Sequence, residues 1–158
     1  MRIALLISVL STGACAAQTP FACPWLSTGS AATVLGGPVT VSAHVEGNQQ
    51  GTCRFTRESD GKLMALEITI GKEDTHLCPP GSMKLVALGN EAVQCKSVNA
   101  KGLWLDVIAG RIRNLYFAVS TGNVLDAATV PSVPARPLDP YGASVLERVT
   151  EQVVGNLY

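Results

Sequence analysis

The chain has 158 residues, of which 47% are hydrophobic, and its 12 basic side chains balance 12 acidic ones. A chain of this length can bury one hydrophobic core. The balanced charge offers no basic stripe for nucleic acid and no acidic tail, so nucleic acid is not expected as a partner.

The first 17 residues have the three-part layout of a secretory signal. Arg2 supplies the positive start, residues 3–10 (IALLISVL) form a short apolar run, and residues 11–17 are small or polar. The apolar run is too short to span a bilayer as a helix, and no later segment reaches membrane length. We therefore predict a signal peptide over 1–17, cleaved after Ala16 or Ala17, and a single domain over 18–158.

Cys15 allows a second interpretation of the leader. It could be a lipid-attachment cysteine, although residues 11–14 (STGA) lack the leucine expected near such a site. Both interpretations predict export, to the periplasm or the medium, and they differ in whether a lipid anchor is present.

Four cysteines remain after the leader: Cys23, Cys53, Cys78 and Cys95. An even set in an exported chain indicates disulfides, and four cysteines allow three pairings. We predict the sequential pairing, Cys23–Cys53 and Cys78–Cys95, because each bond then closes a modest loop between neighbouring elements. No Cys-x-x-Cys spacing is present, which argues against a metal or redox set.

The first half of the mature chain predicts a short helix and three strands. Ser27 and Thr28 can cap the helix, and Gly36-Gly37 can end it. Alternating apolar and polar residues then predict strands, separated by turns at 47–51 and at Asp60-Gly61. These strands are expected over 39–46, 52–57 and 62–70.

The later part is less regular. Residues 72–82 contain Cys-Pro-Pro-Gly and predict a loop. Two more strands are expected over 91–98 and 110–121, and the apolar connection 99–109 could be strand or short helix. The predicted fold is therefore α+β, with an antiparallel sheet of about five strands.

Prolines at positions 131, 134, 137 and 140 follow a spacing of three, which is typical of an extended polyproline segment. We interpret residues 129–141 as a stiff connector, with a ligand for an aromatic groove as the alternative. Asp139 and Pro140 then predict the start of a final helix. Its apolar residues follow helical spacing and are expected to pack on the sheet: Val145, Leu146, Val149, Val153 and Leu157.

The chain contains the short motifs CPWLST at 23–28, VLGGPV at 34–39, GTCRF at 51–55 and LGNEAV at 88–93. Together these motifs resemble an actinobacterial family of small exported lipoproteins of unknown function. The resemblance implies a sheet with helices packed on it, related to the PsbP-like fold, and it supports a Cys23–Cys53 bond. The chain departs from the family in its weak lipid-attachment signal and in carrying Cys78 and Cys95. The family supplies no catalytic residues to transfer.

Few residues suggest chemistry. Asp74, His76 and Cys78 alternate along one loop, but with Cys78 oxidised only two metal ligands remain, too few for a site. His44 is expected on the polar face of a strand. Arg111 and Arg113 are expected on one side of a strand, where they could contact a carboxylate or phosphate.

These observations favour an exported interaction or accessory domain of the bacterial cell envelope, without evident catalytic chemistry and without a cofactor or metal. Its partner would be an envelope protein or a small ligand. The first alternative is a carrier of small apolar ligands, with a pocket between the final helix and the sheet lined by Val149 and Val153. The second is a small secreted hydrolase using His44 or His76.

Overall fold

The computed structural model describes residues 22–47, 49–75, 77–98, 104–123 and 140–158. The predicted leader with Cys15 lies outside these residues, as do His76 and the proline-rich connector up to Asp139. The described elements comprise two helices and seven strands: α1 (Thr28–Leu35), β1 (Thr40–Val45), β2 (Gly51–Ser59), β3 (Lys62–Gly71), β4 (Met83–Leu85), β5 (Glu91–Val98), β6 (Trp104–Ile112), β7 (Leu115–Asn123) and α2 (Pro140–Gly155).

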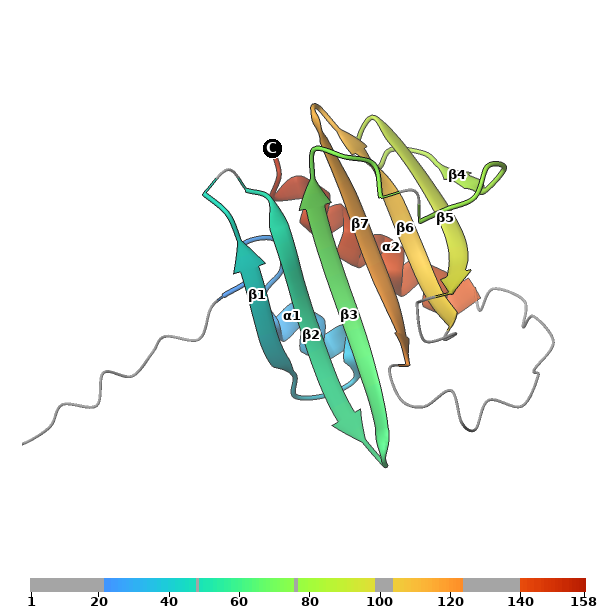
Figure 1. Cartoon of the computed structure of the whole chain (residues 1–158). Coiled ribbons are helices and arrows are strands. Elements are labelled where there is room, and N and C mark those ends of the chain that lie inside the picture. Colours follow the sequence, from blue (N-terminus) through green and yellow to red (C-terminus); the bar gives the residue numbers. More distant parts are fainter. Residues whose placement is uncertain (1–21, 48, 76, 99–103, 124–139) are drawn as a thin grey trace, which may run out of the picture.

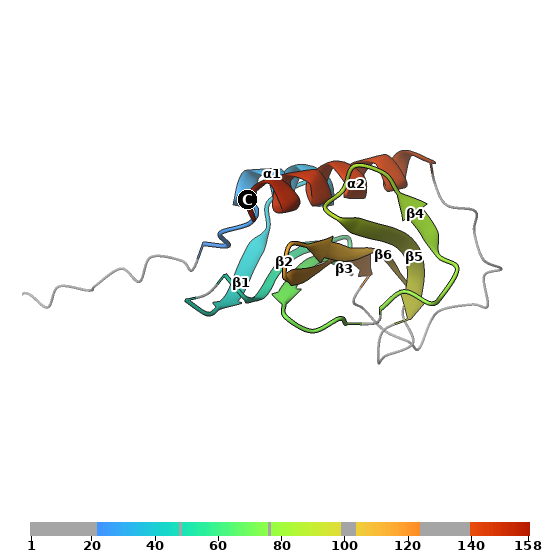
Figure 2. The same cartoon turned by 90° about the horizontal axis from the view of Figure 1, so that it is seen from above.

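The strands form one antiparallel sheet in the order β1-β2-β3-β7-β6-β5-β4. Both helices lie on the same face of this sheet, α1 against β2 and β3 and α2 against β6 and β7 (Figure 1). The opposite face carries no helix among the described residues, and we call it the helix-free face (Figure 2). The fold is therefore a two-layer α+β arrangement dominated by its sheet.

The sheet has seven strands, so the expectation of about five was wrong. The predicted strand 110–121 is in fact the end of β6, a turn at Arg113 and Asn114, and most of β7. The undecided connection before it contributes the beginning of β6. Residues 83–85 add the short edge strand β4.

The ends of α1 follow the sequence prediction. The side chain of Ser27 accepts a hydrogen bond from the Ser30 amide at 3.0 Å, which satisfies one of the free donors of the first turn. Gly36 adopts a left-handed conformation with φ 78° and ends the helix. Arg57 on β2 donates a hydrogen bond to the carbonyl of Leu35, placing a positive charge at the negative end of the helix.

The main core lies between the helices and the sheet. Phe55, Ile68, Phe117 and Val119 point from the strands toward the helices and are almost completely buried. α2 contributes the predicted apolar stripe, with Leu146, Val149, Val153 and Leu157 buried and Val145 half-buried. Leu157 lies just after the end of the helix and still packs into this core.

Two links hold the N-terminal segment against this core. A disulfide joins Cys23 to Cys53 of β2, with 5.8 Å between their Cα atoms. The Asn156 side chain donates a hydrogen bond of 3.0 Å to the carbonyl of Trp25, beside the end of α2. Trp25 itself is 1% exposed, so this segment belongs to the folded core.

Candidate binding face

The connection between β3 and β4 crosses the helix-free face. β3 and β4 are neighbours in sequence, but β7, β6 and β5 lie between them in the sheet. The connecting residues 72–75 and 77–82 therefore pass over these three strands, below the sheet in Figure 2 and opposite the helices. We call this segment, apart from His76, the strap.

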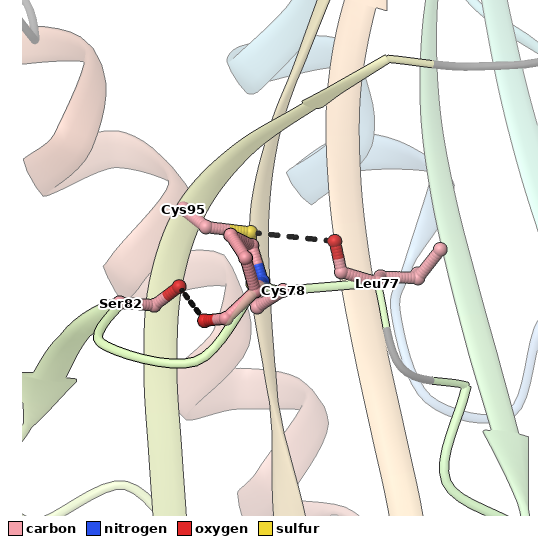
Figure 3. The surroundings of a disulfide bond; sticks show 5 residues. Leu77, Cys78, Ser82 and Cys95 are labelled. Atoms are coloured by element: carbon pink, nitrogen blue, oxygen red, sulfur yellow. Dashed lines mark hydrogen bonds between the residues drawn. A yellow bond between two sulfur atoms is a disulfide. The ribbon is translucent and has the colours of Figure 1, made fainter.

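A second disulfide fixes the strap to the sheet. Cys78 in the strap is bonded to Cys95 of β5, with 5.6 Å between their Cα atoms (Figure 3). The Cys95 sulfur lies 3.7 Å from the carbonyl oxygen of Leu77. The Ser82 hydroxyl donates a hydrogen bond of 2.6 Å to the carbonyl of Pro79 and closes the turn that follows. The strap is thus held at a defined place across the strands, and the two disulfides are those of the sequential pairing.

A small apolar cluster gives the strap a surface to pack on. Val107, Ala109 and Ala118 are buried on the helix-free face, and the disulfide of the strap packs against them. Side chains at successive positions of a strand point to opposite faces, so these residues alternate with the main core residues of β6 and β7. The middle of each of these strands is consequently buried on both faces, which explains the apolar runs at 107–109 and 117–119.

A hollow of about 220 Å³ lies between the strap and the sheet. Asp74 and Leu77 of the strap line one side, and Glu91, Arg111 and Tyr116 line the strands. These last three residues share one row of the sheet, because Arg111 pairs with Glu91 of β5 and with Tyr116 of β7. The floor is made by the apolar side chains of Val93 and Ala109 and by the backbone at Ala92 and Gly110, whose own side of the sheet is the helix-bearing one.

Arg111 and Glu91, which both line the hollow, form a long ion pair. A guanidinium nitrogen of Arg111 is 3.8 Å from a carboxylate oxygen of Glu91, and both side chains are substantially exposed. Such a surface pair contributes little to stability. The Nε of Arg111 is buried and has no hydrogen-bond partner. The hollow therefore combines a guanidinium group, two carboxylates and a phenol ring over an apolar floor, an arrangement that suits a polar side chain with an apolar stem.

Arg111 and Arg113, expected to point together to one side of a strand, face different surroundings. Arg111 lies on the helix-free face and lines the hollow. Arg113 lies in the turn after β6, with φ 54°, and its amide donates a hydrogen bond of 2.7 Å to the Asn90 side chain. Its guanidinium carbon is 5.1 Å from the centre of the Tyr158 ring. The strand ends at Ile112, so Arg113 lies in the turn and not on the strand face that carries Arg111.

The other candidate residues are also dispersed. His44 is exposed on β1, and His76 lies outside the described residues. Asp74 lines the hollow, and Cys78 is held in its disulfide. Within the described ranges, no group of three or more His, Cys, Asp or Glu residues is placed to hold a metal ion.

Val149 and Val153, the residues expected to line a carrier pocket, are buried in the main core. A groove of about 450 Å³ beside Val149 lies between the two helices, with Val34 and Val145 at its sides and Ser30, Thr33, Arg148 and Gln152 around it. The space next to Val149 is therefore a surface groove between α1 and α2.

In the part of the chain that the structure describes, no helix combines the length and apolar character needed to cross a membrane. The two disulfides are consistent with folding in an oxidising compartment. No protein-family model, curated protein or solved structure matches this chain.

The residues of the hollow were only partly visible in the sequence. Arg111 and Asp74 were recognised as candidates, whereas Glu91 and Tyr116 were not. Glu91 and Tyr116 could be found only from the pairing of strands, because β5 and β7 place them in the same row of the sheet as Arg111.

Proposed function

We propose that this chain is an exported interaction or accessory domain of the bacterial cell envelope, and that it contacts a protein partner through the helix-free face around the hollow. The observation that carries the proposal is the strap, a disulfide-fixed segment that crosses three strands and holds a mixed-charge hollow open. In this proposal residues 1–17 direct export, with cleavage after Ala16 or Ala17, and lipid attachment at Cys15 is the alternative.

The distribution of side chains supports this choice of face. The main core on the other face lies beneath α1 and α2, and the apolar residues of these helices that face the sheet are buried there. Around the hollow, by contrast, Leu77 is 38% exposed, and Asp74 and Glu91 are also exposed. An apolar side chain beside charged groups is the composition of a small recognition surface, in which the apolar part contributes affinity and the polar groups contribute specificity.

The rigidity of the surface also supports binding. A strap held by a disulfide loses little conformational freedom when a partner docks, which reduces the free-energy cost of association. The resemblance to exported lipoproteins and to the PsbP-like fold agrees with such a role, and remains part of the proposal.

Site-directed photo-crosslinking in the native host tests the proposal. A photoreactive amino acid replaces Leu77 on the helix-free face, and the matched control replaces Thr33, which is exposed on α1 on the opposite side. We expect one envelope protein to be captured repeatedly from position 77 and not from position 33. The proposal is contradicted if no protein is captured from position 77, or if positions 77 and 33 capture the same proteins.

The captured protein is then purified and titrated against the wild-type chain, Leu77→Asp and Thr33→Asp. Removing a partly buried leucine contact and placing a charge there should weaken binding by roughly tenfold to a hundredfold. Thr33→Asp should bind like the wild type. Thermal denaturation of each variant establishes that the folded state is retained.

A further inference from the structure

The two edges of the sheet differ in how they are protected. β4 forms one edge and has only three residues, with Lys84 at its centre. β1 forms the other edge, and its six residues, TVSAHV, pair with β2 in an unbroken register. Thr40–Val45 contains no lysine, arginine, carboxylate or proline, the residues that natural proteins use to block edge-to-edge pairing.

The hydrogen-bond pattern of the first hairpin shows which backbone groups of β1 face outward. The amide of Glu46 donates to the carbonyl of Gln50 at 2.7 Å. Bonded and non-bonded pairs alternate along an antiparallel ladder, so the backbone groups of His44, Ser42 and Thr40 face β2. The amides and carbonyls of Val41, Ala43 and Val45 therefore face away from the sheet, and no described residue pairs with them.

We propose that β1 pairs with β1 of a second copy of this chain, antiparallel and about a two-fold axis at Ala43. In this register Ala43 faces Ala43 of the second copy, and Val41 faces Val45 in both directions. The six outward amides and six outward carbonyls of the two facing strands then form six hydrogen bonds, two in each of the three pairs. If the two-fold axis were at Ser42 instead, the outward amide and carbonyl of Val45 would face residues of the second copy that precede β1.

The side chains agree with this self-pairing. Val45 is 38% exposed, and in this register Val41 of the second copy covers it on the helix-bearing face. On the helix-free face, Ser42 lies beside His44 of the second copy, and both side chains are exposed. The strand carries no formal charge with histidine neutral, so two copies do not repel one another. The product is a continuous sheet across two chains, with an isologous interface.

Cysteine crosslinking tests the register directly. Facing residues of a non-bonded pair have Cα atoms about 4.5 Å apart, which a disulfide can bridge, whereas diagonal positions are about 8 Å apart and cannot be bridged. A mixture of the Ser42→Cys and His44→Cys proteins, purified after export, should therefore form a covalent dimer on mild oxidation. Each variant alone should not. Efficient crosslinking of either variant alone, or none in the mixture, overturns the proposed register.

Sedimentation of the unmodified protein from micromolar to millimolar concentration measures the association itself. Ala43→Pro removes an outward amide that β2 does not use, and a proline there is compatible with an edge strand. It deletes two of the six intermolecular bonds, so the association constant should fall by roughly tenfold to a hundredfold. A wild-type protein that stays monomeric throughout overturns the proposal.

A charge variant provides a second measurement in case the proline perturbs folding. Ser42→Lys places two lysines close to the axis and should weaken association through their repulsion. Thr33→Lys, the matched change on α1, should leave it unaltered. Equal association in Ser42→Lys and Thr33→Lys contradicts pairing through β1.

Discussion

Gly110 shows how one residue without a side chain shapes the core. A Cβ atom at this position would lie 2.8 Å from Cζ of Phe117 and 2.2 Å from the carbonyl oxygen of Glu91. Gly110 pairs with Phe117 across β6 and β7, and the ring, 1% exposed, occupies the space above the glycine. The glycine thus allows an aromatic ring to pack closely against the backbone of β6.

We predict that Gly110→Ala lowers the free energy of unfolding by about 1–3 kcal/mol, because the added methyl group overpacks a closed part of the core. Gly47→Ala is the matched control, since a Cβ there meets no heavy atom within 4 Å. The control should change stability by no more than about 0.5 kcal/mol. Urea denaturation of both variants measures the difference, and equal stabilities would contradict the packing argument.

Arg111 and Arg113 show which placements can be predicted from residue patterns and which cannot. Because side chains alternate between the two faces of a strand, Arg111 and Arg113 were expected on the same face. This rule applies only within a continuous strand. The chain turns at Arg113 and Asn114, where Asn114 is the only turn-favouring residue and no glycine or proline reinforces its signal. Arg111 was correctly placed on a strand, whereas its neighbours in the hollow depend on pairing between distant strands.

At the scale of elements, the strap depends on its disulfide. Cys78–Cys95 closes a separation of 17 residues and Cys23–Cys53 one of 30. In the chain-entropy model, loss of the first bond costs about 3 kcal/mol and loss of the second slightly more. The two bonds therefore contribute similarly to stability while holding different parts of the molecule.

We predict that the double variant Cys78→Ser/Cys95→Ser is destabilised by about 3 kcal/mol and becomes sensitive to limited proteolysis within residues 72–82. The control, Cys23→Ser/Cys53→Ser, should lose comparable stability while its strap stays resistant under folding conditions. Mass spectrometry of the fragments locates the cleavage. Cleavage of the strap at the same rate in both variants would show that the disulfide does not fix this segment.

The elements themselves were largely predictable. The short helix, the first three strands and the apolar stripe of the last helix follow from local capping and periodicity, and the structure has them within a few residues. The strand number was underestimated because β4 is only three residues long and because the predicted strand 110–121 continues across the β6–β7 turn. The placement of β3 beside β7 is a long-range pairing that no local pattern encodes.

For the whole molecule, the cysteine arrangement and the leader together predict a defined mature form. Protein recovered from its native host should begin after Ala16 or Ala17 and have lost four hydrogens to two disulfides. Intact-mass measurement before and after reduction tests both features. An acylated chain that begins at Cys15 would favour the lipid-anchored alternative, and an uncleaved chain with free thiols would contradict export.

The strand order has a consequence for how the protein reaches its folded state. β1 to β3 form one consecutive hairpin series and β4 to β7 another, and the two series meet only along β3 and β7. Each half can form from nearby residues, but the central pairing must wait for both, which makes it a slow, non-local step. Until then β3 and β7 expose open edges beside Ile68 and Val119, and molecules at high concentration can join through these edges instead. Newly synthesised chains therefore face a competition between closing their own sheet and aggregating with one another.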